Sequence, residues 1–282
     1  YMDWSKAKTI LIVALIVTNV LLGYVLFVDS SRVDATLDKN FIKETTRLLN
    51  ERDIKLSTDI PITNENLYGL TVEYETYESQ TLNDNFFNGK GSINLKSEGL
   101  QDIEYGDEIV TLVNDKLIIY ESKSKDEFYN IQTDEQAIEI ATSFLKEKGI
   151  PLSDMNLIFL KKVKGVYNLE FTKIHEEHYL ESTFTNIKLD NKGVIKLERT
   201  WLDVIDTGEK IIEVSSAPKS LLALLSMEEV RGKTIKDISL CYYFNPEKHE
   251  YLEDPNEAQR GRTIPAWRIQ FEDGYKVFID NY

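Results

Sequence analysis

A run of 20 residues without a charged side chain, residues 9–28, constrains this chain more than any other feature. A helix of that length rises about 30 Å, which matches the hydrocarbon core of a bilayer. The alternative is a cleaved signal peptide, whose apolar region is usually about 7–15 residues long and ends in small residues at a cleavage site. Here the run is longer, and residues 29–34 carry no such pattern. We therefore expect one uncleaved transmembrane helix.

Flanking charges indicate the orientation of this helix. Lys6 and Lys8 directly precede the run, whereas Arg32 and Lys39 follow it at a greater distance and among acidic residues. The positive-inside rule then places the N-terminus in the cytoplasm. We expect a single-pass protein of the cell membrane with residues 1–8 inside and everything after residue 28 outside.

Small and polar residues mark one stretch of the expected helix. Ala14 and Thr18 form a pair of small residues four positions apart, Asn19 follows, and Gly23 lies one turn further on. Small residues let helices approach closely in lipid, and an amide can form a hydrogen bond to a neighbouring helix. These four residues are our candidates for contact with another transmembrane helix. The alternative is that Thr18 bonds its own backbone and Asn19 is tolerated.

Charge and cysteine content narrow the compartment and the partners. The formal net charge is −15, and no basic stripe is present, so nucleic acid is not an expected partner. Cys241 is the only cysteine, so no intramolecular disulfide can form. Because secreted eukaryotic domains of this size usually carry several disulfides, a bacterial surface fits better. Cys241 lies in an apolar run, which predicts a buried and unreactive thiol.

Periodicity in the first half of the outer part predicts a helix followed by strands. Residues 34–55 carry apolar side chains at helical spacing with charges between them. Residues 70–77 alternate and read as a strand, and residues 78–106 are polar and predict loops and short strands. Residues 109–122 predict a β-hairpin that turns at Asn114 and Asp115.

A second helix carries complete start and stop signals. Thr133 followed by Gln136 three positions later is a capping box, and Gly149 with Pro151 ends the helix. Four strand-like runs follow, at residues 157–163, 166–174, 179–190 and 194–202. This pattern predicts one helix followed by an antiparallel meander.

A similar unit is expected to follow. Ser216 is a candidate N-cap with Pro218 in the first turn of a helix over 215–226. The helix starts Thr133 and Ser216 are 83 residues apart, and the glycines Gly193 and Gly274 are 81 apart, which suggests a duplicated module. The later strands are expected at residues 235–244, 266–271 and 275–282.

The expected fold is therefore α+β, with an N-terminal single transmembrane helix followed by an ectodomain of tandem helix-plus-antiparallel-sheet modules. The expected divisions are a cytoplasmic N-terminus at 1–8, the transmembrane helix at 9–28, a membrane-proximal helix with an N-terminal α+β region at 29–130, module 1 at 131–205 and module 2 at 206–282.

No motif of an enzyme is found in the chain. His175 and His178 are three residues apart between two strands, which does not fit H-E-x-x-H, and a polar turn is the favoured interpretation over a zinc site. The chain contains neither G-x-S-x-G nor a phosphate-binding glycine motif. Trp201 and Trp267 are expected in the core or at its rim. We therefore expect no catalytic residues, no metal and no cofactor.

Both ends of the chain resemble a known family. The start MDWSKAKTI running into a single apolar span resembles the N-terminal signature of the YycI (WalI) family, and the ending IPAWRIQFEDGYKVFIDNY is similar to the last hairpin of that family. The length also agrees, so the resemblance covers the whole chain in layout, although only the two ends are motif-like.

The resemblance implies a membrane regulator of an essential cell-wall two-component system. It implies a lipid-embedded helix, pairing with a YycH-like membrane protein of related architecture, and contact with the transmembrane helices of a WalK-type sensor histidine kinase. The family has no catalytic motif to transfer to this sequence. The alternative function is a membrane-anchored extracytoplasmic binding module for a wall fragment or peptide.

Overall fold

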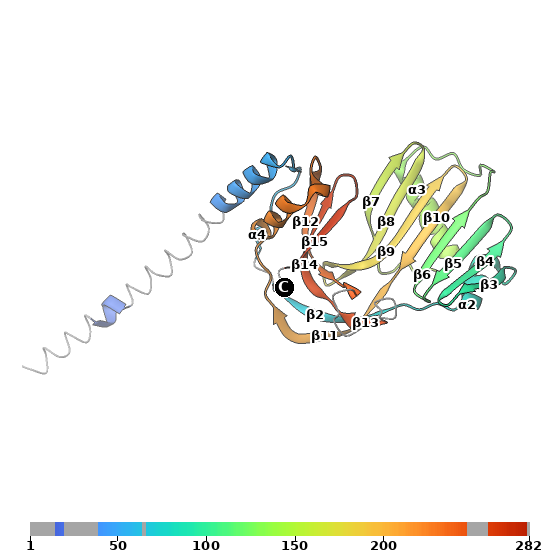
Figure 1. The fold of residues 1–282 in the computed structure, drawn as a ribbon, viewed down its shortest axis with the longest axis horizontal. Helices are drawn as coiled ribbons and strands as arrows, with labels where there is room; N and C mark the ends of the chain where they lie inside the picture. Colours follow the sequence, from blue (N-terminus) through green and yellow to red (C-terminus); the bar gives the residue numbers. More distant parts are fainter. Residues whose placement is uncertain (1–14, 20–38, 64–65, 247–258, 281–282) are drawn as a thin grey trace, which may run out of the picture.

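The computed structural model describes residues 15–19, 39–63, 66–246 and 259–280 (Figure 1). The described part is mixed α+β, rich in strands and with few helices, which confirms the predicted fold class at that level. The described helices are the stretches at residues 15–19 and 39–51, α2 (Ser79–Phe87), α3 (Asp134–Glu147), α4 (Ala217–Leu221) and the 3-10 helices η1 (Leu222–Ser226) and η2 (Glu228–Val230).

Twelve strands form one continuous sheet. Nine of them follow the order β15-β14-β12-β9-β10-β6-β5-β4-β3, while β1 pairs with β12, β8 with β9 and β7 with β8. The strands of this sheet are β1 (Lys55–Leu56), β3 (Ser92–Ser97), β4 (Leu100–Tyr105), β5 (Glu108–Val113), β6 (Leu117–Ser122), β7 (Met155–Val163), β8 (Val166–His175), β9 (His178–Asp190), β10 (Gly193–Thr200), β12 (Thr234–Tyr243), β14 (Ile264–Phe271) and β15 (Lys276–Ile279).

A smaller sheet of three strands completes the fold. Its order is β11-β2-β13, with β2 (Leu67–Tyr74) between β11 (Leu202–Ile212) and β13 (Arg260–Arg262). The predicted limit between residues 205 and 206 falls inside β11. The other predicted domain limits are not tested by the arrangement of the strands, and all of them stay predictions.

Strand β9 joins the two halves of the large sheet. Residues 179–181 pair in parallel with β12, whereas residues 184–190 pair in antiparallel with β10. Between these stretches Ser182 has a φ of 76°, and the register with β8 shifts. An irregularity of this kind bends a strand and redirects its side chains. The strands of both predicted modules therefore share one hydrogen-bonded sheet.

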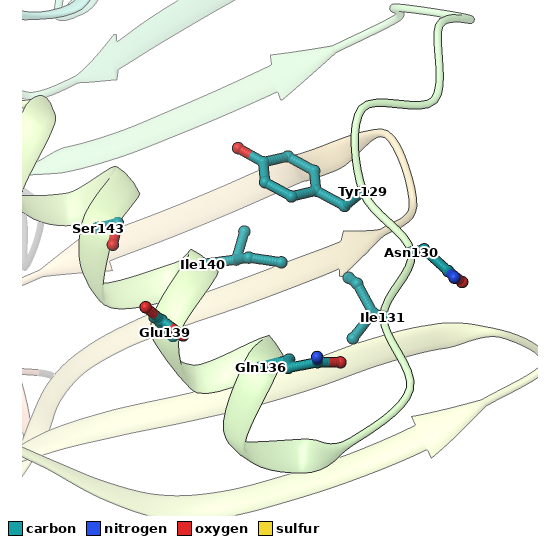
Figure 2. Close-up of a pocket in the computed structure, with 7 residues that line it drawn as sticks. All are labelled: Tyr129, Asn130, Ile131, Gln136, Glu139, Ile140 and Ser143. Atoms are coloured by element: carbon teal, nitrogen blue, oxygen red, sulfur yellow. The ribbon is translucent and has the colours of Figure 1, made fainter.

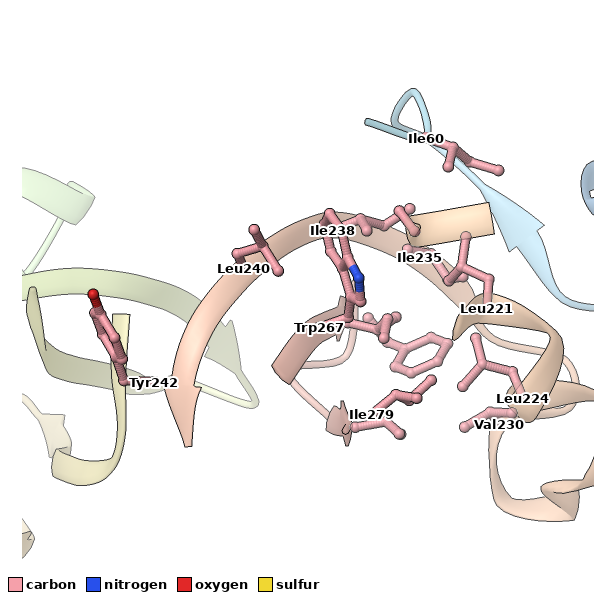
Figure 3. Close-up of a cluster of buried hydrophobic side chains, with 14 of the residues drawn as sticks. Ile60, Leu221, Leu224, Val230, Ile235, Ile238, Leu240, Tyr242, Trp267 and Ile279 are labelled. Atoms are coloured by element: carbon pink, nitrogen blue, oxygen red, sulfur yellow. The ribbon is translucent and has the colours of Figure 1, made fainter. Parts of the chain in front are cut away.

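Two hydrophobic clusters lie in this architecture. One contains α2, α3 and strands β4–β10, with residues from Leu82 to Leu197. The other brings Leu49, Leu70 and the C-terminal strands together, and Figure 3 shows Trp267 and Ile279 facing the α4–η1 segment across it. Leu49 and Leu70, although early in the chain, therefore share a core with its C-terminal part.

The hairpin predicted at residues 109–122 is confirmed. Strands β5 and β6 pair in antiparallel, and Asn114 and Asp115 have φ values of 49° and 57°. Two consecutive residues in the left-handed region are typical of a type I′ turn, which asparagine and aspartate tolerate better than other non-glycine residues. The local sequence was sufficient here because the turn chemistry fixes the register.

Helix α3 begins at the predicted capping box. The N–H of Gln136 donates to Oγ1 of Thr133 at 3.3 Å, and the N–H of Thr133 donates to Oε1 of Gln136 at 3.3 Å. Gly149 follows the helix with a φ of 74°. The helix packs Ala137, Ala141 and Leu145 against the sheet, as the apolar stripe predicts.

We expect Thr133→Ala to lower the free energy of unfolding by about 1 kcal/mol, because the substitution leaves a helix N–H without its acceptor. Thr133→Ser keeps the hydroxyl and serves as the control, with a stability close to that of the parent chain. Urea denaturation followed by circular dichroism measures both. An unchanged midpoint in Thr133→Ala would contradict the role of the cap.

One prediction about a helix is wrong, and the predicted N-cap at Ser216 is confirmed. Residues 79–87, predicted as loops and short strands, form α2, whose N-cap Glu78 makes no side-chain cap bond. The helix is held instead by bonds to the segment that follows it, since Asn83 donates to the carbonyl of Gly91 at 3.0 Å and accepts from its N–H at 2.7 Å. Ser216 is the N-cap of α4 but makes no side-chain cap bond, and the helix continues as a 3-10 turn.

Candidate interaction sites

The predicted contact residues lie at the edge of the described structure. Thr18 and Asn19 belong to a helical stretch at residues 15–19 and are exposed, whereas Ala14 and Gly23 lie outside the described residues. Of the helices that the structure describes, none has the length and apolar character needed to cross a membrane. Residues 9–14 and 20–28 of the predicted span are outside the described part, so the transmembrane helix stays a prediction.

The helix at 39–51 is anchored in the C-terminal core. Leu49 is fully buried in the cluster that contains the C-terminal strands. Oγ1 of Thr45 donates to the carbonyl of Pro218 at 3.4 Å, and Nε of Arg52 donates to the carbonyl of Leu225 at 3.0 Å. Figure 1 shows this helix beside α4. Residues 39–51 are therefore fixed to the folded body.

Arg268 is the centre of a buried ionic cluster on the face of β14 opposite Trp267. Its guanidinium donates to Glu181 at 2.6 Å, to Asp237 at 2.8 Å and to Gln270 at 2.8 Å. It also lies over the ring of Tyr179, 4.4 Å from the centroid. The side chains of Arg268 and Glu181 are only 1% and 3% exposed, so this pair is shielded from water.

Lys276 extends the cluster to β8. Its ammonium donates to Glu181 at 3.1 Å and to Glu170. Glu170 and Glu181 come from β8 and β9, whereas Arg268 and Lys276 come from β14 and β15. The cluster, which we call the Arg268 cluster, therefore links the two halves of the large sheet.

A second buried arginine lies where the chain crosses between the two sheets. Arg199 donates to Thr185 at 2.9 Å, to Glu75 at 2.9 Å and to the hydroxyl of Tyr77 at 3.1 Å, and its guanidinium lies 4.3 Å from the ring centroid of Trp201. Burial raises the pKa of Tyr77, so its hydroxyl stays protonated. The N–H of Glu75 also donates to the carbonyl of Trp201 at 2.9 Å, which pairs the two crossing segments.

Neither arginine was selected from the sequence. A signal was present, because Arg268 stands between Trp267 and Ile269 in a strand that is otherwise apolar, and Arg199 lies two residues before Trp201. A charge in such a strand requires a buried partner. The partners are 87 and 124 residues away, so the sequence could not name them. The two tryptophans are 2% exposed, as expected of core residues.

Asp154 is a partly buried carboxylate whose ionised form the fold stabilises. Burial alone would raise its pKa, but the indole N–H of Trp201 at 3.0 Å and the ammonium of Lys173 at 3.1 Å outweigh this and hold the pKa below its ordinary value of 3.8. A lowered folded-state pKa contributes stability above the unfolded-state value, and this contribution disappears as the pH falls through the folded-state value.

We expect Asp154→Asn to be less sensitive to acid than the parent chain below about pH 4, because the neutral amide has no such contribution to lose. The measurement is the difference in urea midpoint between pH 6 and pH 3 for both proteins. Asp126→Asn, which changes an exposed carboxylate, is the matched control. Equal acid losses in the parent and Asp154→Asn would contradict the assignment.

The two histidines and the cysteine considered in the sequence analysis lie among residues of the β-strands. His175 and His178 flank the turn between β8 and β9, and both rings lie 5.9 Å from the ring of Tyr242. In the part of the chain that the structure describes, no group of three or more metal-binding side chains is assembled. Cys241 is fully buried, and burial raises its pKa well above 9.0, which keeps the thiol protonated.

Two hollows lie along the exposed side of α3, and together we call them the α3 groove. The first, of about 410 Å³, lies between α3 and the connection at residues 123–132 (Figure 2). The second, of about 450 Å³, continues past the ring of Tyr129, which lines both. From α3 the groove is lined by residues at helical spacing, namely Gln136, Glu139, Ile140, Ser143, Phe144, Glu147 and Lys148.

A third hollow, of about 600 Å³, lies on the three-stranded sheet beside an irregularity in β11. Gly208 approaches the carbonyl of Gly69 so closely that a Cβ there would lie 2.9 Å from the oxygen. Lys210 and Arg262 line this hollow together with Asp206. Its lining carries both acidic and basic side chains.

Comparisons with known proteins give distant structural similarities. No family model matches the chain, and no curated protein matches it. The structure is similar to that of an uncharacterized protein from Eubacterium rectale, with a TM-score of 0.49 and 11% identity over 80% of this chain and 86% of that one. It is also similar to the C-terminal domain of YpeB from Bacillus megaterium, with a TM-score of 0.39 and 11% identity over 73% of this chain and 93% of that one. Neither similarity points to the YycI family.

Proposed function

We propose that this chain is a non-enzymatic regulator of a sensor histidine kinase that belongs to a cell-wall two-component system. It acts from the cell membrane, with its N-terminus in the cytoplasm, through one transmembrane helix and an extracellular body of tandem modules. Its partners are a YycH-like membrane protein and the kinase. The resemblance of both chain ends to the YycI family supports this proposal, together with the length of the apolar run.

The observation that carries the mechanism is the burial of Leu49 and Thr45 in the C-terminal core. Because the helix at 39–51 is packed against this core, a partner that binds the extracellular body also restricts how the preceding apolar segment is presented. Helix packing in the membrane then favours one of two kinase states. Allosteric coupling of about 1–3 kcal/mol is typical of such effects.

A chimera tests the proposal. Residues 2–33 are placed on an unrelated extracellular domain, and the output of the cognate kinase is measured in cells. Retained control of the kinase in either direction supports action through the helix. Complete loss of control, with membrane insertion verified, favours a function of the extracellular body.

Crosslinking gives an independent test in intact membranes. Photoreactive residues at Asn19 and Gly23 are expected to capture the kinase or the YycH-like partner, whereas the same group at Val17, on another side of the helix, is expected to capture less. Equal capture from all three positions would argue against a specific helix contact.

The second candidate function is a membrane-anchored module that binds a peptide or wall fragment outside the cell. The α3 groove favours it, because hollows of about 300–1,000 Å³ lined by aromatic and polar groups are typical of ligand sites. Binding measurements on the chain, described in the next subsection, test this function separately from kinase control.

A further inference from the structure

The α3 groove has the length of a short extended peptide. The helix residues that line it run from Gln136 to Lys148, which spans about 18 Å at about 1.5 Å per residue. An extended chain rises about 3.3 Å per residue, so five residues fill this length. The groove is divided at Tyr129, whose ring reaches over Ile140 toward Ser143 (Figure 2).

The opposite wall presents backbone carbonyls that are available to a ligand. The connection at residues 123–132 is irregular, and the N–H groups of Phe128 and Tyr129 both donate to the carbonyl of Asn191 at 2.9 Å. The backbone carbonyls of residues 124–131 accept no hydrogen bond from the described parts of the protein. A wall of this type suits a ligand with its own backbone N–H groups, as in peptide recognition by strand addition.

The side chains that line the groove indicate which kinds of side chain a bound peptide carries. Phe128, Tyr129 and Tyr105 line the second hollow and are 67%, 46% and 44% exposed, so apolar or aromatic side chains of a ligand can cover them. Two acidic side chains of the groove, Glu139 and Asp107, make no side-chain bond within the described residues. Only one basic side chain of the groove, Lys192, is unpaired in the same described part.

The other charged groups of the groove are already paired. The carboxylate of Glu147 lies 3.1 Å from the ammonium of Lys148, and Glu108 accepts from Tyr120. The excess charge that remains is negative, as is that of the whole chain at −15. Electrostatic complementarity therefore favours a basic ligand.

We propose that the α3 groove binds an extended segment of about five residues from a partner polypeptide, with at least one basic side chain at Glu139 and an apolar or aromatic side chain against Tyr105 and Phe128. The inference gives the binding-module function its ligand class and rests on that function. It does not rest on the kinase proposal, which the chimera tests in cells.

The test uses the full chain in detergent micelles and a positional-scanning library of acetylated, amidated pentapeptides. We expect the best binders to combine lysine or arginine with an aromatic or branched side chain. Glu139→Lys and Tyr129→Ala are each expected to weaken the best binder at least tenfold. Methylation of the peptide backbone nitrogens should weaken it by a similar factor, because it removes the donors to residues 124–131.

Matched controls lie outside the groove. Glu272→Lys makes the same charge change at an exposed site, and Tyr68→Ala removes a tyrosine that is 41% exposed on β2. Both are expected to bind as the parent chain does. Circular dichroism verifies that each variant is folded, and Glu139→Lys remains informative if Tyr129→Ala is not.

Three results would overturn the proposal. The first is a library without any saturable binder at millimolar concentration. The second is a best binder that the groove variants hold as tightly as the parent chain. The third is binding of a β-1,4-linked N-acetylglucosamine trimer that Tyr129→Ala abolishes while no peptide binds, since the groove would then be a saccharide site.

Discussion

Replacement of Arg268 by methionine is expected to lower the free energy of unfolding by about 3–5 kcal/mol, a large part of the stability of a typical domain. The guanidinium contacts Glu181, whose side chain is only 3% exposed. Methionine fills a similar volume but leaves that carboxylate with Lys276 alone at 3.1 Å, and a buried charge that loses a partner is costly. Urea denaturation of the full chain in detergent measures the loss.

Two further variants separate this effect from the loss of a surface charge. Arg260 pairs with Glu73 at 3.3 Å, but its side chain is 58% exposed, so Arg260→Ala should cost less than about 1 kcal/mol. The double variant Arg268→Met with Glu181→Leu should be less destabilised than the sum of its two single variants, because the buried carboxylate of Glu181 is removed together with its partner. If Arg268→Met costs no more than Arg260→Ala, the Arg268 cluster does not hold the two halves together.

The second large effect is expected at Leu49. Truncation to alanine removes a fully buried side chain from the C-terminal core and should cost about 2–5 kcal/mol. Because this side chain attaches the helix at 39–51 to the core, amide hydrogen exchange in residues 45–51 should become faster than in β10, which belongs to the other core. Mass spectrometry of peptic fragments resolves the two regions.

Phe41→Ala is the control for this experiment. Phe41 is on the same helix but 38% exposed, so its truncation should change stability by only about 0.5 kcal/mol. If Leu49→Ala loses stability but stays folded and loses kinase control in cells, attachment of the helix matters for signalling. If it loses stability and exchanges uniformly throughout the chain, the helix belongs to one cooperative unit. An unchanged stability would contradict the packing.

Local features of the fold were predictable from the sequence, and the distant ones were not. The capping box at Thr133 and the turn at Asn114 and Asp115 are set by residues within four positions of each other, so their outcome follows from the chain itself. Helix α2 was missed because its bonds to Gly91 and its packing depend on tertiary contacts. The shared sheet was missed because the pairing of β9 with β12 joins residues about 60 positions apart.

The candidate sites divide in the same way. The transmembrane contact residues came from the composition of one segment, and they stay predictions because most of that segment lies outside the described residues. The Arg268 cluster and the α3 groove depend on residues far apart in the chain, such as Glu181 and Arg268 in the cluster or Tyr105 and Lys192 in the groove. Exposed aromatic residues at 128 and 129 were the only local sign of the groove, and polar surroundings made them look like loop residues.

The passage of β9 from one set of strands to the other has a consequence for attempts to dissect this protein. Shortening the chain after β10 would strip residues 179–181 of their hydrogen-bonding neighbour and leave Leu49 and Leu70 without cover. Such a fragment would expose an unpaired strand edge next to solvent-exposed aliphatic side chains, and this combination promotes self-association. Aggregation of such fragments would therefore reflect the loss of the pairing between β9 and β12. It would not show which half of the protein carries the biological activity.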